Sequence, residues 1–107
     1  MRKSEVMKGS VELAVLSMLG RKKMHGYKVT KELNLSTDRV LSIAEGTLYL
    51  MLKRLEKRKY IRGNWEVGRG ARKIHTYAIT PAGRKELKAR VAHWKILQGA
   101  LNNVISN

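Results

Sequence analysis

The chain has 107 residues, enough for one domain with a modest core, and 43% of them are hydrophobic, which favours a folded protein over a disordered one. Its 23 lysine and arginine residues outnumber 8 acidic residues and give a formal net charge of +15, so we expect a polyanionic partner such as DNA, RNA or an anionic membrane surface. The absence of cysteine excludes disulfides and thiolate metal sites and suits a reducing cytoplasm.

The first predicted helix begins after Ser10, which can cap it, and runs through VELAVLSMLG to Gly20. Apolar residues lie on nearly every side of it, as is typical of a helix buried on more than one side. The basic N-terminus leads into only a short apolar stretch that contains Glu12, and no run approaches the ~18 apolar residues of a membrane helix. We therefore expect no signal peptide, no membrane partner and a cytoplasmic location.

A second helix is predicted over residues 25–34, with Val29 and Leu33 facing inward. The basic turn RKKM precedes it. An exposed loop over residues 35–41 and a brief extended segment, LSIA, then lead to the third helix.

The third predicted helix starts near Glu45, because Gly46 is unfavourable in a helix interior. Its inward face carries leucines at i, i+4 and i+7, namely Leu48, Leu52 and Leu55. Its outward face is polar and basic, and carries Thr47, Tyr49, Lys53, Lys57 and Arg58.

After Tyr60 the apolar residues alternate with a period of two, which predicts strands on either side of the loop GRGAR at residues 68–72. The first strand places Ile61, Gly63, Trp65 and Val67 on one side, and the second runs from Lys73 to Ile79. A helix followed by a basic hairpin is the order of the recognition helix and wing in a winged-helix module. Such a module places its helix in the major groove and its wing on the backbone or in the minor groove.

Thr80 and Pro81 predict the start of the last helix, with threonine as the N-cap and proline at the first helical position. Apolar residues continue at spacings of three or four to about Val104, a helix of ~30 Å that its own module cannot cover. We therefore expect an α+β, mostly α fold: a winged helix-turn-helix with a two-stranded wing in residues 1–80, and a long C-terminal dimerisation helix in residues 81–107.

Three segments resemble the signature blocks of the PadR family of transcriptional regulators: HGYKVTKEL (25–33), EGTLYLMLKRLE (45–56) and KIHTYAITPAGRKEL (73–87). The resemblance spans residues 8–105. A chain with one C-terminal helix is similar to the short subgroup of that family, which dimerises through this helix and the first one. Two residues depart from the family pattern. Leu50 replaces a proline and restores a backbone N–H, and Lys59 replaces a glycine, so it must adopt a left-handed conformation or the helix must end differently.

The residues expected to contact DNA lie at the start of the second helix, on the third helix and in the wing: Tyr27, Lys28, Thr47, Tyr49, Lys53, Arg69, Arg72 and Lys73. The third helix has an alternative interpretation, in which Thr47 is a cap, Tyr49 a half-buried aromatic and Lys53 part of a solvated face. The wing residues discriminate better, because a plain hairpin turn needs the glycines but not the arginines.

The residues expected in the dimer interface come from the first and last helices: Leu13, Leu16, Val91, Trp94, Leu97, Leu101 and Val104. The resemblance further implies that a small hydrophobic or aromatic effector binds between the paired C-terminal helices, with Trp94 as its stacking surface. The alternative for Trp94 is packing within the dimer alone.

No cofactor and no enzymatic activity are expected, because the chain lacks a phosphate-binding loop, a paired-carboxylate arrangement and a nucleophile elbow. The three histidines are not at metal-ligand spacing, and His25 is expected to cap or pack the second helix. The function predicted is that of a homodimeric, effector-responsive repressor that binds a pseudo-palindromic operator. The alternative is a sequence-independent RNA-binding or nucleoid-type protein, and a third interpretation is a protein-binding adaptor, against which the charge argues.

Overall fold

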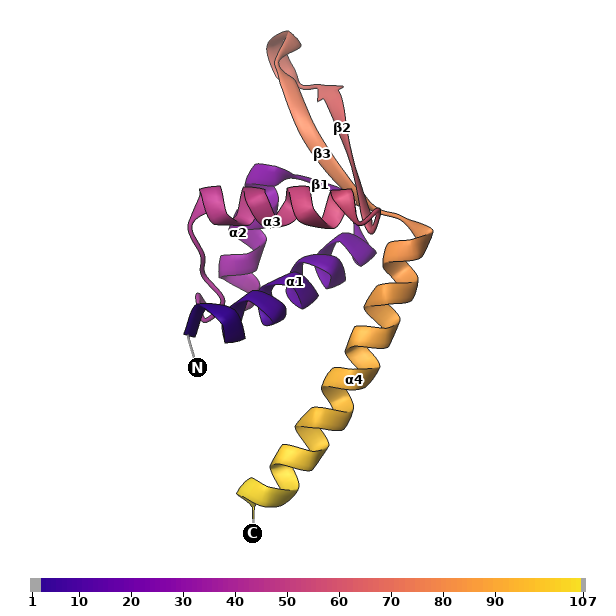
Figure 1. The fold of residues 1–107 in the computed structure, drawn as a ribbon. Helices are drawn as coiled ribbons and strands as arrows, with labels where there is room; N and C mark the ends of the chain where they lie inside the picture. Colours follow the sequence, from indigo (N-terminus) through magenta and orange to yellow (C-terminus); the bar gives the residue numbers. More distant parts are fainter. Residues whose placement is uncertain (1–2, 107) are drawn as a thin grey trace.

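The computed structural model describes the backbone of residues 3–106 and the side chains of residues 8–106, so the outer limits of the two predicted domains lie outside the described residues. In chain order the elements are α1 (Lys3–Arg21), β1 (Met24–His25), α2 (Gly26–Ser36), α3 (Glu45–Lys57), β2 (Ile61–Val67), a 3-10 turn (Arg69–Ala71), β3 (Lys73–Ile79) and α4 (Pro81–Ile105). α1, α2 and α3 lie together, the hairpin of β2 and β3 projects from one side of them, and α4 extends away on the other (Figure 1). The predicted α+β, mostly helical winged-helix fold is confirmed.

The core lies among the first three helices and the base of the sheet. α1 is buried on more than one side, as its all-round apolar pattern predicted, and the inward leucines of α3 are all buried. The core side chains are Val11, Val15, Leu16, Met18, Leu19, Val29, Leu33, Leu48, Met51, Leu52, Leu55, Ile61 and Tyr77.

The sheet has three antiparallel strands in the order β1-β3-β2, with Met24 opposite Tyr77 and Trp65 opposite His75. The wing strands agree with the predicted alternation. β1 was not predicted, because a strand of two residues is too short to show a period. Residues 41–44, for which a brief extended segment was predicted, form no strand, and Ala44 at their end has an extended backbone.

The limits predicted for the first helix were wrong at both ends. α1 begins by Lys3, so Ser10 lies inside the helix rather than at its N-cap, and the helix continues through Gly20 to Arg21. Gly20 has a packing role instead, because the Cδ2 atom of Leu87 lies 3.0 Å from where a Cβ would be. The glycine lets α4 approach α1 closely.

The junctions on either side of the wing are fixed by local hydrogen bonds. Lys59, where the family pattern has glycine, adopts a left-handed conformation with φ of 66°. The Thr80 side chain accepts a hydrogen bond from the N–H of Gly83 at 2.9 Å and donates to the carbonyl of Lys59 at 2.6 Å. Thr80 therefore caps α4, as predicted, and ties its start to the end of α3.

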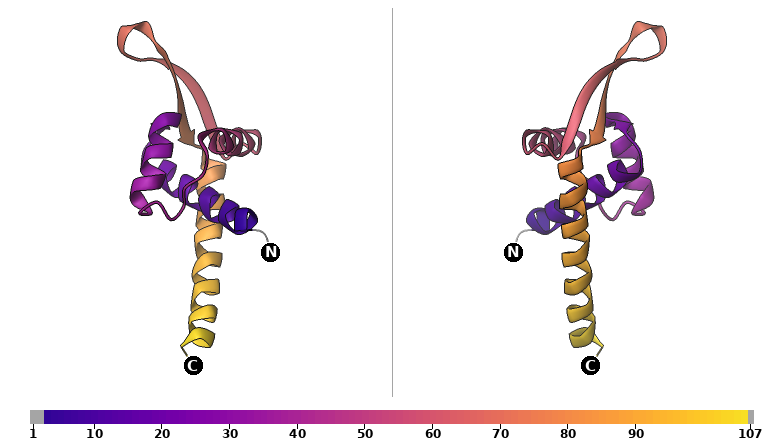
Figure 2. Two further views of the ribbon diagram at one scale, coloured as in Figure 1. Left: turned by 90° about the vertical axis from the view of Figure 1, so that its left-hand side faces the viewer. Right: turned by 90° about the vertical axis from the view of Figure 1, so that its right-hand side faces the viewer.

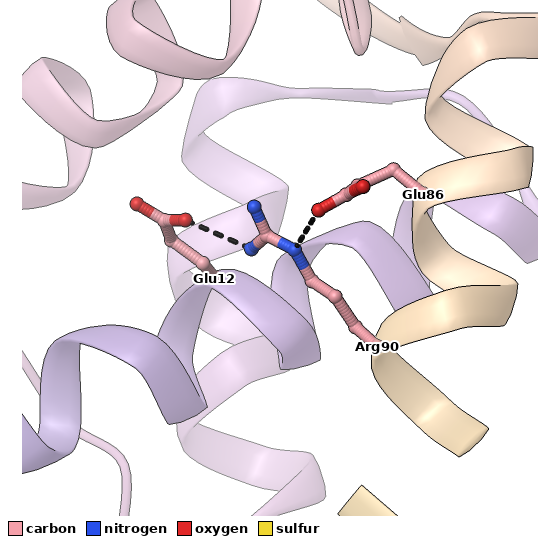
Figure 3. Close-up of polar contacts among 3 residues, drawn as sticks. All are labelled: Glu12, Glu86 and Arg90. Atoms are coloured by element: carbon pink, nitrogen blue, oxygen red, sulfur yellow. Dashed lines mark hydrogen bonds and ion pairs between the residues drawn. The ribbon is translucent and has the colours of Figure 1, made fainter. Parts of the chain in front are cut away.

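α4 is held against α1 through its first turns by polar contacts. The Arg90 guanidinium donates to Glu12 of α1 at 2.9 Å and to Glu86 at 2.6 Å (Figure 3), and Arg84 donates to the carbonyl of Gly20 at 3.0 Å. Burial by itself lowers the pKa of Arg90, but the hydrogen bonds and charges of the two carboxylates outweigh it and raise the pKa. Beyond these contacts α4 leaves the other helices (Figure 2), and its side chains there are mostly exposed.

Candidate nucleic-acid interface

A notch of about 680 Å³ lies between the start of α2, the N-terminal half of α3 and the wing, which lines it from Tyr77 at its base to Arg72 in its loop. Four of the predicted DNA-contacting residues line it: Tyr27 of α2, Tyr49 of α3, Lys73 of β3 and Arg72 of the wing loop. The fold therefore brings together residues that are separated by up to 46 positions in the chain.

The first turn of α3 faces solvent. Ala44 is the N-cap residue and provides no side-chain cap, so the structural alternative in which Thr47 caps this helix does not apply. Tyr49 is exposed, and the Nζ atom of Lys53 lies 5.0 Å from its ring centroid, a cation–π arrangement. The exposed side of this turn thus presents a hydroxyl, an aromatic ring and a positive charge.

The start of α2 is capped by a histidine. The Nδ1 atom of His25 accepts a hydrogen bond from the backbone N–H of Lys28 at 3.2 Å, which confirms the capping role predicted for His25. The ring of Tyr27 stacks with that of His25 at a centroid separation of 6.0 Å. Tyr27 and Lys28 are both exposed.

The wing loop is closed by a hydrogen bond from the N–H of Gly68 to the carbonyl of Arg72 at 2.6 Å. Gly70 has φ of 68°, a left-handed conformation that glycine adopts easily. The three basic side chains predicted for the wing, Arg69, Arg72 and Lys73, are all exposed.

Three rings follow one another along one face of the wing. The rings of Trp65 and His75 stack with their centroids 4.6 Å apart and their planes at 15°, and the His75 ring lies 4.5 Å from that of Tyr77. Burial, with the charges of Tyr49 and Glu56, raises the pKa of Tyr77 to about 12. The sequence pattern alone does not single out these residues, although its period of two places Trp65 and Gly63 on the same face.

The second candidate surface lies between α1 and α4, where a hollow of about 550 Å³ is lined in part by Leu13, Trp94 and Leu97. Of the predicted interface residues on α4, Trp94 is 47% exposed and Leu101 is 50% exposed, and Leu97 and Val104 are exposed as well. Leu13 and Val91 are partly exposed. The prediction for Leu16 was wrong: its side chain is 0% exposed because it is already packed in the core of its own chain.

Among residues 3–106, no helix is long and apolar enough to cross a membrane. The same part of the chain brings no three histidine or acidic side chains together in a group that could hold a metal ion.

A sequence model of the transcriptional regulator PadR-like family matches residues 15–89. The chain is 30% identical over 95 residues to an uncharacterized protein of Lysinibacillus sphaericus, covering 88% of this chain and 86% of that protein. Its fold is similar to that of a transcriptional regulator from Clostridium thermocellum, with a TM-score of 0.82, 32% identity and coverage of 92% and 96% of the two chains. It is also similar to a PadR-like transcriptional regulator from Bacillus cereus, with a TM-score of 0.85, 25% identity and coverage of 96% and 98%.

Proposed function

The chain belongs to the PadR-like family of transcriptional regulators, and we propose that it is a homodimeric repressor that binds a pseudo-palindromic operator and is released by a small effector. This family consists of DNA-binding regulators and not of enzymes. The proposal goes beyond family membership in four respects: that the protein represses transcription, forms a homodimer, recognises a pseudo-palindromic operator and responds to an effector.

The observation that carries DNA binding is the shared notch of α3 and the wing. We assign Thr47 and Tyr49 to base edges in the major groove, because they stand exposed at the start of α3. The basic residues in and beside the notch bind phosphates under this proposal, namely Lys28, Lys53, Arg69, Arg72 and Lys73, and Tyr27 adds a backbone contact. Two such units related by a two-fold axis would meet two successive major grooves.

The proposed dimer rests on the exposed apolar stripe of α4. Trp94, Leu97, Leu101 and Val104 recur at helical spacing on a helix that leaves the other helices. Apolar surface of this extent is uncommon on a monomer, and a second copy of α4 would cover it. Leu13 and Val91 complete the interface, and Leu16 is not part of it.

The proposed effector site is the hollow between α1 and α4, where Trp94 offers a flat apolar wall. In the dimer a flat hydrophobic or aromatic ligand there would contact both copies of α4. Such a ligand would favour one spacing of the two recognition helices over another through its different contacts with the two arrangements, and so change operator affinity.

The test of DNA binding is a fluorescence anisotropy titration of genomic fragments, a random duplex and single-stranded RNA at several salt concentrations. Replacing Arg72 with alanine should weaken binding to every duplex and lower the log–log salt slope by about one, because each phosphate neutralised contributes about 0.9 to it. Lys88→Ala is the charge-matched control, since Lys88 is exposed on α4, away from the wing.

Preferential binding of a genomic fragment over the random duplex would support an operator-binding regulator. Equal binding of all duplexes, or tighter binding of the RNA, would instead favour a sequence-independent basic protein. If Arg72→Ala and Lys88→Ala changed the salt slope equally, the phosphate role of the wing would be refuted.

A further inference from the structure

The stacked rings of the wing run from the core out to solvent. Tyr77 at the base is 1% exposed, His75 in the middle is partly exposed, and Trp65 at the outer end is 66% exposed. The hairpin of β2 and β3, which carries these rings, projects beyond the helices (Figure 2). The indole is therefore a large apolar group held at the surface on a column of two further rings.

The column is fixed in place by its neighbours. The hydroxyl of Tyr77 and the Nδ1 atom of His75 lie 3.2 Å apart and share a hydrogen bond. Gly63, opposite Tyr77 in the ladder, leaves the space in which the His75 ring lies, because a Cβ at that position would overlap the His75 Nε2 atom. The carboxylate of Glu56 in α3 approaches the same point, 3.0 Å from the position of that Cβ. The imidazole is thereby held flat beneath the indole, and Trp65 needs little further ordering to bind a surface.

The charges of the wing differ between its two faces. The pairing places Trp65, Val67, Lys73 and His75 on one face, which has no acidic residue along either strand. The acidic residue of β2, Glu66, belongs to the other face, where it pairs with Lys23 at 3.2 Å and accepts a hydrogen bond from Thr76 at 3.2 Å. Glu56 of α3 approaches this face only at Gly63, near its base, so the outer part that carries the indole is apolar and basic, with exposed Val67 opposite Lys73 in the ladder.

We propose that Trp65, positioned by His75 and Gly63, packs against the deoxyribose wall of a DNA groove while the adjacent basic residues bind the phosphates. The sugars present apolar C–H surface between two rows of negative charge, so an apolar ring flanked by cations complements them. The indole N–H can donate to a phosphate oxygen at the edge of the same groove. Minor-groove proteins also place apolar side chains in the groove, where these wedge between base steps, whereas the contact proposed here is with the sugars at the groove wall.

This inference rests on the proposed DNA binding and adds to it a contact that salt does not screen. Arg72 neutralises a phosphate and contributes to the salt slope, whereas an indole releases no counterion. Loss of Trp65 should therefore lower affinity by the same factor at every salt concentration. If roughly 60 Å² of apolar surface leaves water, that factor is about ten.

The experiment uses wild-type protein labelled with ¹⁵N and a duplex of about 20 base pairs of random sequence. The chain has two tryptophans, so its spectrum contains two indole N–H signals, which Trp65→Phe assigns. On addition of duplex the Trp65 signal should move much further than the Trp94 signal. In anisotropy titrations Trp65→Ala should lose about tenfold in affinity with an unchanged salt slope, and Trp65→Phe should lose less because it keeps a ring on His75.

A matched control is Leu35→Ala, which removes an exposed apolar side chain at the far end of α2 and should leave affinity unchanged. Gly63→Ala should displace His75 and reproduce part of the Trp65→Ala loss while both tryptophans remain. An unmoved Trp65 signal together with wild-type affinity of Trp65→Ala, in a protein that still binds duplex, would overturn this inference alone. Absence of any duplex binding by the wild type would overturn the proposed function and this inference with it.

Discussion

Replacing Arg90 with methionine tests how α4 is fixed to the rest of the chain. In the cluster of Figure 3, Arg90 supplies the positive charge and joins two carboxylates, Glu12 of α1 and Glu86 of α4. Methionine keeps the aliphatic part of the side chain, so it leaves packing largely intact and removes the charge. The free energy of unfolding should fall, because Glu12 then remains as an unpaired carboxylate inside the protein.

The exposure of the three side chains sets the size of the effect. The Glu12 side chain is only 9% exposed, whereas those of Arg90 and Glu86 are 23% and 30% exposed. Removing one partner of a fully buried pair costs about 3–5 kcal/mol. Since water reaches part of Arg90, we expect a loss of roughly 2–3 kcal/mol. Glu86→Gln should cost only about 0.5 kcal/mol, because that carboxylate is more exposed and belongs to an i, i+4 pair within one helix.

The assay is denaturant unfolding followed by circular dichroism at one fixed protein concentration, since the proposed dimerisation would make apparent stability depend on concentration. The double variant Glu12→Gln with Arg90→Met should recover most of the loss, because the buried position 12 is then neutral and the only carboxylate left without Arg90 is the more exposed Glu86. Equal losses for Arg90→Met and Glu86→Gln, or a double variant no more stable than Arg90→Met, would refute the reasoning.

Three other predictions address the interface, the wing and the hollow. Leu101→Asp places a charge in the proposed dimer contact and should give a monomer by sedimentation; an unchanged dimer would rule out this interface. Because burial raises the pKa of Tyr77 to about 12 from 10.0, the folded state keeps the phenol proton after the unfolded chain has lost it. Stability measured by denaturant unfolding should therefore fall between about pH 10 and 12 in the wild type relative to Tyr77→Phe, and parallel curves would contradict this. In a Trp65→Phe background, planar aromatic compounds at concentrations on the order of tens of micromolar should quench Trp94 fluorescence, and no quenching by any of them would leave Trp94 with a packing role.

The sequence by itself determined the parts of this protein that depend on neighbours along the chain. The leucine spacing of α3, the alternation of the wing strands, and Thr80 with Pro81 at the start of α4 each specify a local conformation, and the structure confirms all three. Lys59 is a further local case. The family pattern has glycine at this position, so the sequence implied either a left-handed lysine or a different helix end, and Lys59 is left-handed.

Only the tertiary structure decided which apolar side chains of α1 face the core and which remain free. A helix that is apolar on nearly every side has no period from which to choose a face, so the sequence assigned both Leu13 and Leu16 to the interface. In the folded chain Leu16 is completely buried in the core, whereas Leu13 is partly exposed and lines the hollow beside α4.

The tertiary structure also decided the contacts between distant segments. Glu12 and Arg90 are 78 residues apart, and each by itself reads as an ordinary charged residue on a helix. The space that Gly63 leaves for His75 likewise exists only once β2 and β3 pair in one register. Local patterns specify which face of an element is apolar, but an ion pair or a close approach depends on where two elements meet in space, and this is decided by the packing of the whole chain.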